Sequence, residues 1–109
     1  MPTPKPPPEP VTRLLEAANA NEIDAFLATF ADDGVVDDWG REFVGLGAIR
    51  AWSDREFIGQ QVSLDIRDVQ TDGDVTVVTA DVGGHGFNGP SHFSFSLDRG
   101  RVSRMTITG

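Results

Sequence analysis

The sequence predicts a single α+β domain over residues 11–109, with three helices covering one face of a curved, antiparallel sheet. Two observations predict this fold class. Apolar residues recur at helical spacing in the first half of the chain, whereas they alternate with polar residues in the second half, as strands require. No internal repeat or alternation of strand, helix and strand is present, which disfavours a parallel sheet. The length of 109 residues also suits one domain.

The N-terminal part predicts a tail and two helices. Residues 1–10 hold six of the seven prolines, which is typical of an extended, disordered tail. Helical spacing of apolar residues predicts a first helix over 11–20, and Asn21 offers a cap for a second. Phe26 and Phe30 belong to the apolar stripe of this second helix.

Two short strands and a third helix follow. We expect the strands over 35–39 and 42–44, on either side of a turn at Gly40. Apolar residues then lie on one broad side of a helix that begins at Ala48 and ends near Gly59. The three helices therefore precede most of the sheet in the sequence.

The remaining residues predict four long antiparallel strands. They are separated by turns at 72–74 and 99–100 and by a glycine-rich connection over 83–90. The phase of alternation slips between Ile66 and Val69, which indicates a bulge. Three helices over such a sheet leave a conical space, and this space is the natural ligand site.

Composition excludes several classes of function. The net charge is -8 and the arginines are scattered singly, whereas nucleic acid requires clustered positive charge. No apolar run approaches the roughly 20 residues of a membrane span. The N-terminus lacks the apolar stretch of a signal peptide, so we expect a cytoplasmic protein.

Metal and cofactor sites are also disfavoured by the residue types. There is no cysteine, which excludes disulfides and thiolate sites, and the two histidines do not stand in a metal-ligand pattern. The glycines have neither the lysine nor the spacing of a phosphate-binding loop. We therefore expect no metal and no cofactor.

Three separated segments resemble one family. They are residues 29–39 (TFADDGVVDDW), 44–52 (VGLGAIRAW) and 89–102 (GPSHFSFSLDRGRV). In type, order and spacing they resemble the ketosteroid isomerase and SnoaL-like polyketide cyclase branches of the nuclear transport factor 2-like superfamily. The resemblance covers residues 11–109 and implies a cone-shaped α+β barrel, the cystatin-like roll.

The resemblance also implies a catalytic residue. Asp38 matches the catalytic base of ketosteroid isomerases, the second acidic residue of their V-E-D-P phrase. The tyrosine and protonated aspartic acid of their oxyanion hole correspond to Leu14 and Ser91. The chain contains no tyrosine, so this oxyanion hole cannot be present in its usual form.

The residues around Asp38 suit proton transfer, because apolar surroundings raise the pKa of a carboxyl group toward neutral pH. If Asp37 faces solvent and Asp38 faces inward, alternation places Val36 inward as well. Asp38 could instead cap a turn or pair with Arg41. The Asp-Arg-Asp grouping of the family's epoxide hydrolases is not evident in the sequence, although Arg41, Arg67 and Arg104 leave it open. Besides Asp38, the expected ligand-binding residues are Trp39, Trp52, Phe26, Phe30, Phe57, Ser91, Phe93 and His85.

Two functions follow from these observations. The first is an isomerase, cyclase or lyase that moves a proton on a small apolar carbonyl compound, with Asp38 as base. The second is a non-catalytic binding or assembly module. Under either function we expect a homodimer, with His92 and the serines and threonines of the late strands on the outer sheet face.

Overall fold

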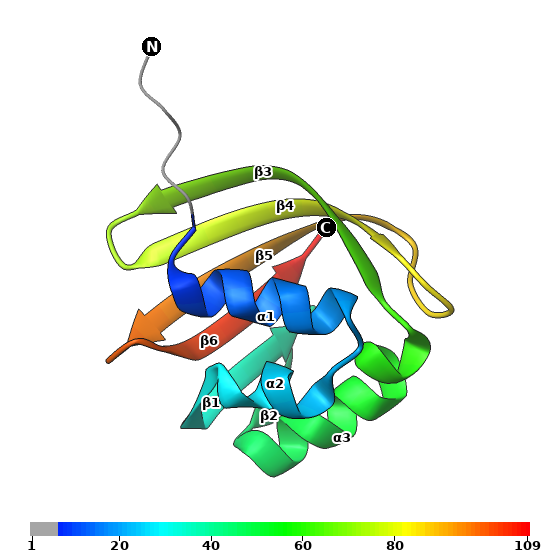
Figure 1. Cartoon of the computed structure of the whole chain (residues 1–109), viewed down its shortest axis with the longest axis horizontal. Coiled ribbons are helices and arrows are strands. Elements are labelled where there is room, and N and C mark those ends of the chain that lie inside the picture. Colours follow the sequence, from blue (N-terminus) through cyan, green and yellow to red (C-terminus); the bar gives the residue numbers. More distant parts are fainter. Residues whose placement is uncertain (1–6) are drawn as a thin grey trace.

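The structure is a computed structural model that describes residues 7–109. In chain order the elements are α1 (Glu9–Asn19), α2 (Ile23–Ala28), β1 (Phe30–Asp38), β2 (Arg41–Val44), α3 (Leu46–Glu56), the 3₁₀ helix η1 (Ile58–Gln60), β3 (Ser63–Asp72), β4 (Val75–Gly83), β5 (Gly89–Asp98) and β6 (Arg101–Thr108). Figure 1 shows the three α-helices on one side of a strongly curved sheet. This is the expected α+β, cystatin-like architecture.

All six strands form one sheet in the order β2-β1-β6-β5-β4-β3. Its two edges, β2 and β3, are not paired with each other within residues 7–109, so the sheet is open and does not close into a barrel. Four of the five strand pairs are antiparallel, as predicted. The pairing of β1 with β6 is parallel, which corrects the expectation of a fully antiparallel sheet.

The hydrophobic core lies between the helices and the inner face of the sheet. Helix α1 presents Leu14 and helix α3 presents Trp52 to it, and strand β5 contributes Phe93 and Phe95. Each of these side chains is almost completely buried. Alternation along β5 places Ser91 on this inner face as well, and leaves His92 exposed on the other.

Several boundaries differ from the sequence prediction. Strand β1 begins at Phe30 rather than at Val35, and α3 spans Leu46–Glu56 rather than Ala48 to Gly59. Helix α1 already begins at Glu9 and holds Pro10 in its first turn, where a missing N–H costs no hydrogen bond. The predicted tail is therefore shorter at its C-terminal end, and residues 1–6 lie outside the described residues. Phe30 is the first residue of β1 rather than part of a helix, because α2 ends at Ala28 and Phe30 pairs with Val102.

The bulge in the third strand is confirmed. The register of β3 against β4 shifts between Ile66 and Asp68, which leaves Arg67 without a partner in the ladder. Alternation predicted it because the apolar phase changes at this point of the chain.

Helix α3 turns directly into η1, and Gly59 makes this possible. A Cβ atom at Gly59 would lie 1.7 Å from the backbone oxygen of Asp54, so only glycine fits there. The turn brings η1 against the cavity described below. No helix within residues 7–109 has both the length and the apolar composition to cross a membrane.

Candidate functional site

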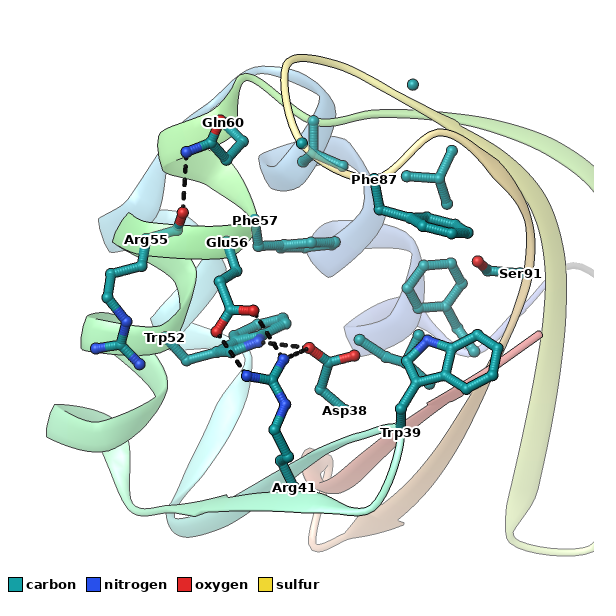
Figure 2. A pocket seen from close by; sticks show the side chains of 16 residues that line it. Asp38, Trp39, Arg41, Trp52, Arg55, Glu56, Phe57, Gln60, Phe87 and Ser91 are labelled. Atoms are coloured by element: carbon teal, nitrogen blue, oxygen red, sulfur yellow. Dashed lines mark hydrogen bonds and ion pairs between the residues drawn. The ribbon is translucent and has the colours of Figure 1, made fainter.

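A cavity of about 570 Å³ opens between helix α3 with η1 and the inner face of the sheet. Its volume falls in the range of small-molecule sites. Figure 2 shows the side chains that line it. They are Asp38, Trp39, Arg41, Trp52, Arg55, Glu56, Phe57, Gln60, Val62, Val82, Gly83, Gly86, Phe87, Ser91, Phe93 and Ile107.

Asp38 reaches the cavity because strand β1 alternates. Val36 is fully buried, and Asp38, two residues later, has only 14% of its side chain exposed. Asp37 points to the opposite face of the sheet, where Arg104 Nη2 donates a hydrogen bond of 2.8 Å to its Oδ2 atom. The two adjacent aspartates therefore occupy different environments.

The Asp38 carboxylate is held by one of its two oxygens. Arg41 Nη2 donates to Oδ2 at 2.6 Å, and the indole Nε1–H of Trp52 donates to the same atom at 3.1 Å. Oδ1 makes no hydrogen bond within residues 7–109. Figure 2 shows the carboxylate between the indoles of Trp52 and Trp39, with both donors on one oxygen. The anchored group thus leaves one oxygen available to a ligand.

Arg41 binds a second carboxylate, that of Glu56 at the end of α3. Its Nη2 lies 2.7 Å from Glu56 Oε1 and its Nη1 lies 3.1 Å from Oε2. The hydrogen bond from Arg41 lowers the pKa of Glu56, and the same bond is the main cause of the raised pKa of Arg41. The guanidinium therefore stands between two carboxylates at the cavity wall.

All three arginines that the sequence left open for a carboxylate–guanidinium–carboxylate group form one. Arg67 bridges two aspartates of β3 and β4. Arg104 bridges Asp37 and Glu42. Of the three, Arg41 is the one that lines the cavity, and its second carboxylate comes from a helix rather than a strand.

The rest of the wall is mostly apolar. The ring of Trp52 stacks on that of Phe57, with 5.0 Å between the ring centroids. The ring centroids of Phe57 and Phe93 lie 6.3 Å apart. Ser91 supplies the one hydroxyl group among the lining residues, and its Oγ makes no hydrogen bond within residues 7–109. The cavity therefore offers a ligand an apolar body together with the Asp38 carboxylate and the Ser91 hydroxyl, and its wall also carries the polar side chains of Arg41, Arg55, Glu56 and Gln60.

The structure brings together most residues that the sequence singled out. Those that line the cavity are Asp38, Trp39, Trp52, Phe57, Ser91 and Phe93. The alternative of an Asp38–Arg41 pair is also present, since that ion pair measures 2.6 Å. Asp38 therefore lies at the cavity wall and is also paired with Arg41.

Three expected ligand-binding residues lie elsewhere. Phe26 and Phe30 are buried in the core, where their ring centroids lie 5.3 Å apart in an edge-to-face arrangement, and neither lines the cavity. His85 is exposed on the β4–β5 loop. Its backbone N–H donates to the Gln60 oxygen at 2.8 Å, while its side chain is not part of the lining.

Several lining residues were missed from the sequence. Glu56 and Gln60 lie on α3 and η1 and gave no local signal, because their role depends on how the helix packs against β1. Phe87 did give a signal, since it is a lone aromatic residue within a glycine-rich stretch. No group of three or more His, Cys, Asp or Glu within residues 7–109 is arranged to hold a metal ion.

Comparison with known proteins identifies the family of this domain. The SnoaL-like domain model matches residues 11–106. A candidate polyketide cyclase of Sinorhizobium meliloti has 30% sequence identity and a TM-score of 0.82, with 93% of this chain and 94% of that chain covered. No match was found among curated proteins.

More distant structures share the fold. An NTF2-like protein of unknown function from Cytophaga hutchinsonii is 11% identical with a TM-score of 0.82, over 99% of this chain and 93% of that chain. A hypothetical protein with a ketosteroid isomerase-like fold from Catenulispora acidiphila was solved in complex with trimethylamine. It is 23% identical with a TM-score of 0.79, over 94% of this chain and 85% of that chain. The chain belongs to the SnoaL-like domain family of the NTF2-like superfamily.

Proposed function

We propose that this protein binds a small, largely apolar carbonyl compound in the cavity and moves a proton on it, with Asp38 as the base. The reaction class is that of an isomerase, cyclase or lyase. One observation carries the proposal: Asp38 is anchored through Oδ2 and presents an unbonded Oδ1 at the wall of an aromatic cavity. A fixed carboxylate with a free oxygen suits general base catalysis.

The proposed step starts with a C–H bond next to the carbonyl group. Asp38 Oδ1 takes the proton, the C–H electron pair forms a carbon–carbon double bond, and the carbonyl π electrons move to the oxygen. Ser91 Oγ–H donates a hydrogen bond to this enolate oxygen. The proton then returns from Oδ1 to carbon, at the same or a conjugated position.

Two neighbours of Asp38 support its role as base. Arg41 and Trp52 both donate to Oδ2, so the carboxylate cannot rotate freely, and a fixed orientation favours attack on a bound ligand. The similarity to a candidate polyketide cyclase at 30% identity agrees with a carbonyl substrate.

Exchange of the α-protons of 2-tetralone for deuterium tests the proposal, because it requires only proton removal and return. We expect the protein to accelerate this exchange in D₂O, as followed by proton NMR. Asp38→Asn should lower the rate by at least about 100-fold while calorimetry shows unchanged binding of the ketone. The matched control is Asp37→Asn, which makes the same change on the other sheet face and should keep the wild-type rate. Equal exchange by Asp38→Asn would contradict the proposal.

The second candidate function is ligand binding without catalysis. The observation that favours it concerns the two positions that correspond to the oxyanion donors of ketosteroid isomerases. Leu14 is fully buried in the core and does not line the cavity, so only Ser91 of these two positions offers a donor. Removing one such donor costs about 100- to 1000-fold in rate. Binding of 2-tetralone without any accelerated exchange would favour this function.

We also propose a homodimer formed through the outer face of the sheet. This face carries short polar side chains, and Thr79 Oγ1 lies 3.0 Å from His92 Nδ1 near its middle. Sedimentation equilibrium should give twice the chain mass of 11.8 kDa. Ser94→Arg, which places a long charged side chain on this face, should give the monomer mass, and a monomeric wild type would contradict the dimer.

A further inference from the structure

Two aromatic side chains at the cavity are largely exposed to solvent, unlike the aromatic residues of the hydrophobic core. Trp39 is 59% exposed and Phe87 is 55% exposed, and both line the cavity. We call these two residues the aromatic rim. Figure 2 shows both rings on the same side of the cavity as Ser91. Large exposed apolar side chains that gather at a cavity are typical of a binding surface.

Trp39 is an unusual residue for the backbone conformation of its turn. Strands β1 and β2 are joined by the two residues Trp39 and Gly40, which have φ angles of 54° and 89°. A two-residue turn with both φ angles positive strongly favours Asn-Gly, and a bulky residue at the first position is strained. The sequence nevertheless places the largest side chain there.

The turn is braced so that the strained conformation persists. Gly40 N–H donates to Asp37 Oδ1 at 2.8 Å, and Trp39 N–H donates to the Ile107 oxygen at 3.1 Å. The first bond joins Gly40 to Asp37 and the second uses only the backbone N–H of Trp39, so neither bond requires the indole. The turn thus keeps a strained backbone at the residue that carries the indole, and strain of this kind is typical of functional positions.

Phe87 is presented in a similar way by the β4–β5 loop. Asn88 Nδ2 donates to the backbone oxygens of Gly84 and Gly86, at 2.9 and 3.1 Å. The N–H of His85 ties the same loop to η1 through Gln60. The loop is thus held by its backbone, while the ring of Phe87 stays exposed beside the cavity.

We infer that the aromatic rim binds a flat aromatic ring of the ligand, whose carbonyl end reaches Asp38 and Ser91. The inference rests on the proposed function, because it assumes the carbonyl ligand in this cavity. Stacking on Trp39 and Phe87 would bury both rings, and aromatic pairs gain more than their buried area because of ring electrostatics. The rim therefore selects an aromatic over a saturated ring of equal size.

Calorimetric binding of two matched ketones tests the inference. The ketones are 2-tetralone and 2-decalone, which share a carbon skeleton but have an aromatic and a saturated outer ring. The wild type should bind 2-tetralone more tightly. Trp39→Asn, which creates the favoured Asn-Gly turn, and Phe87→Ser should each weaken 2-tetralone by about 2- to 12-fold and reduce the preference for it.

Val44→Ala is the control for loss of an exposed apolar side chain, because Val44 is 62% exposed and does not line the cavity. It should bind both ketones as the wild type does. Thermal unfolding of Trp39→Asn should give a melting temperature equal to or above that of the wild type. A clearly lower melting temperature would assign Trp39 to the fold and overturn its role in the rim.

Other outcomes separate the rim from the proposed proton transfer. Wild-type affinity for 2-tetralone in both rim variants would overturn the inference, as would a wild type that binds neither ketone or prefers 2-decalone. Asp38→Asn should keep the preference for 2-tetralone, because the rim acts on binding alone. A rim effect without any catalysed exchange would leave the rim supported and contradict only the proton transfer.

Discussion

The substitution Trp52→Phe removes the hydrogen bond from Trp52 to Asp38 and keeps an aromatic ring at this position. Trp52 is 1% exposed and its Nε1–H donates to Asp38 Oδ2 at 3.1 Å, so the variant loses a hydrogen bond to a charged group in a sheltered site. Such a bond contributes about 1.5–3 kcal/mol. The smaller ring costs a further amount of about 1–2 kcal/mol, because it leaves space beside Phe57.

A double-mutant cycle separates these two contributions. Urea unfolding is measured for the wild type, Trp52→Phe, Asp38→Ala and the double variant, all at one protein concentration because dimerisation would shift stability. The loss of ring volume is common to both backgrounds, so the coupling free energy reports the hydrogen bond and should be about 1.5–3 kcal/mol. Coupling below about 0.5 kcal/mol, the additivity limit for independent sites, would refute the anchoring of Asp38 by Trp52.

Three further predictions concern an ion pair, two glycines and the tryptophans of the cavity. Arg41 lowers the pKa of Glu56 from its ordinary value of 4.5, so this pair stabilises the fold above pH 4.5 and the contribution disappears as the pH falls through the lowered pKa. The difference in urea midpoint between the wild type and Arg41→Gln should therefore be larger at pH 7 than at pH 3, and a constant difference would contradict it. Gly59→Ala should destabilise by about 1–3 kcal/mol or more, because its Cβ would meet the backbone oxygen of Asp54, whereas Gly47→Ala in open space should stabilise α3 by about 0.5–1 kcal/mol. Thermal unfolding of the two variants checks the contrast, and equal shifts would be inconsistent with the packing of η1. Both tryptophans line the cavity, so 2-tetralone should change the intrinsic fluorescence of the wild type, and an unchanged spectrum at saturation would count against binding there.

Much of the fold could be predicted because it depends on local periodicity. Helical spacing located α1 and α3, and alternation of period two located β3 to β6, including the bulge near Arg67. The same alternation gave the inward direction of Ser91, which shares a face of its strand with Phe93 and Phe95. These features follow from which side of a single element is apolar, and such information is contained in short stretches of sequence.

The features that could not be predicted join distant segments. The parallel pairing of β1 with β6 joins residues 30–38 to residues 102–107, and no local pattern in the sequence indicates a pairing over this separation. The bridge from Arg41 to Glu56 depends on the packing of α3 beside β2. Helical spacing extends the second helix to Phe30, because an apolar residue fits either periodicity where a helix runs directly into a strand.

The residues that line the site were predicted where they lie on regular strands and missed where they lie on loops. Arguments from alternation work for Ser91 and Phe93 on β5, because every second residue of a strand shares a face. They fail for His85 and Phe87, since the glycine-rich loop has no fixed alternation. There the bends of the backbone decide which side chain enters the cavity.

The most direct test of the central claim is a crystal structure of the protein with 2-tetralone bound. We expect the ketone inside the cavity, with one α-carbon within about 3.5 Å of Asp38 Oδ1 and its oxygen within hydrogen-bond distance of Ser91 Oγ. A ketone that binds outside the cavity, or that lies inside it with its α-carbons far from Asp38, would contradict the assignment of Asp38 as the base.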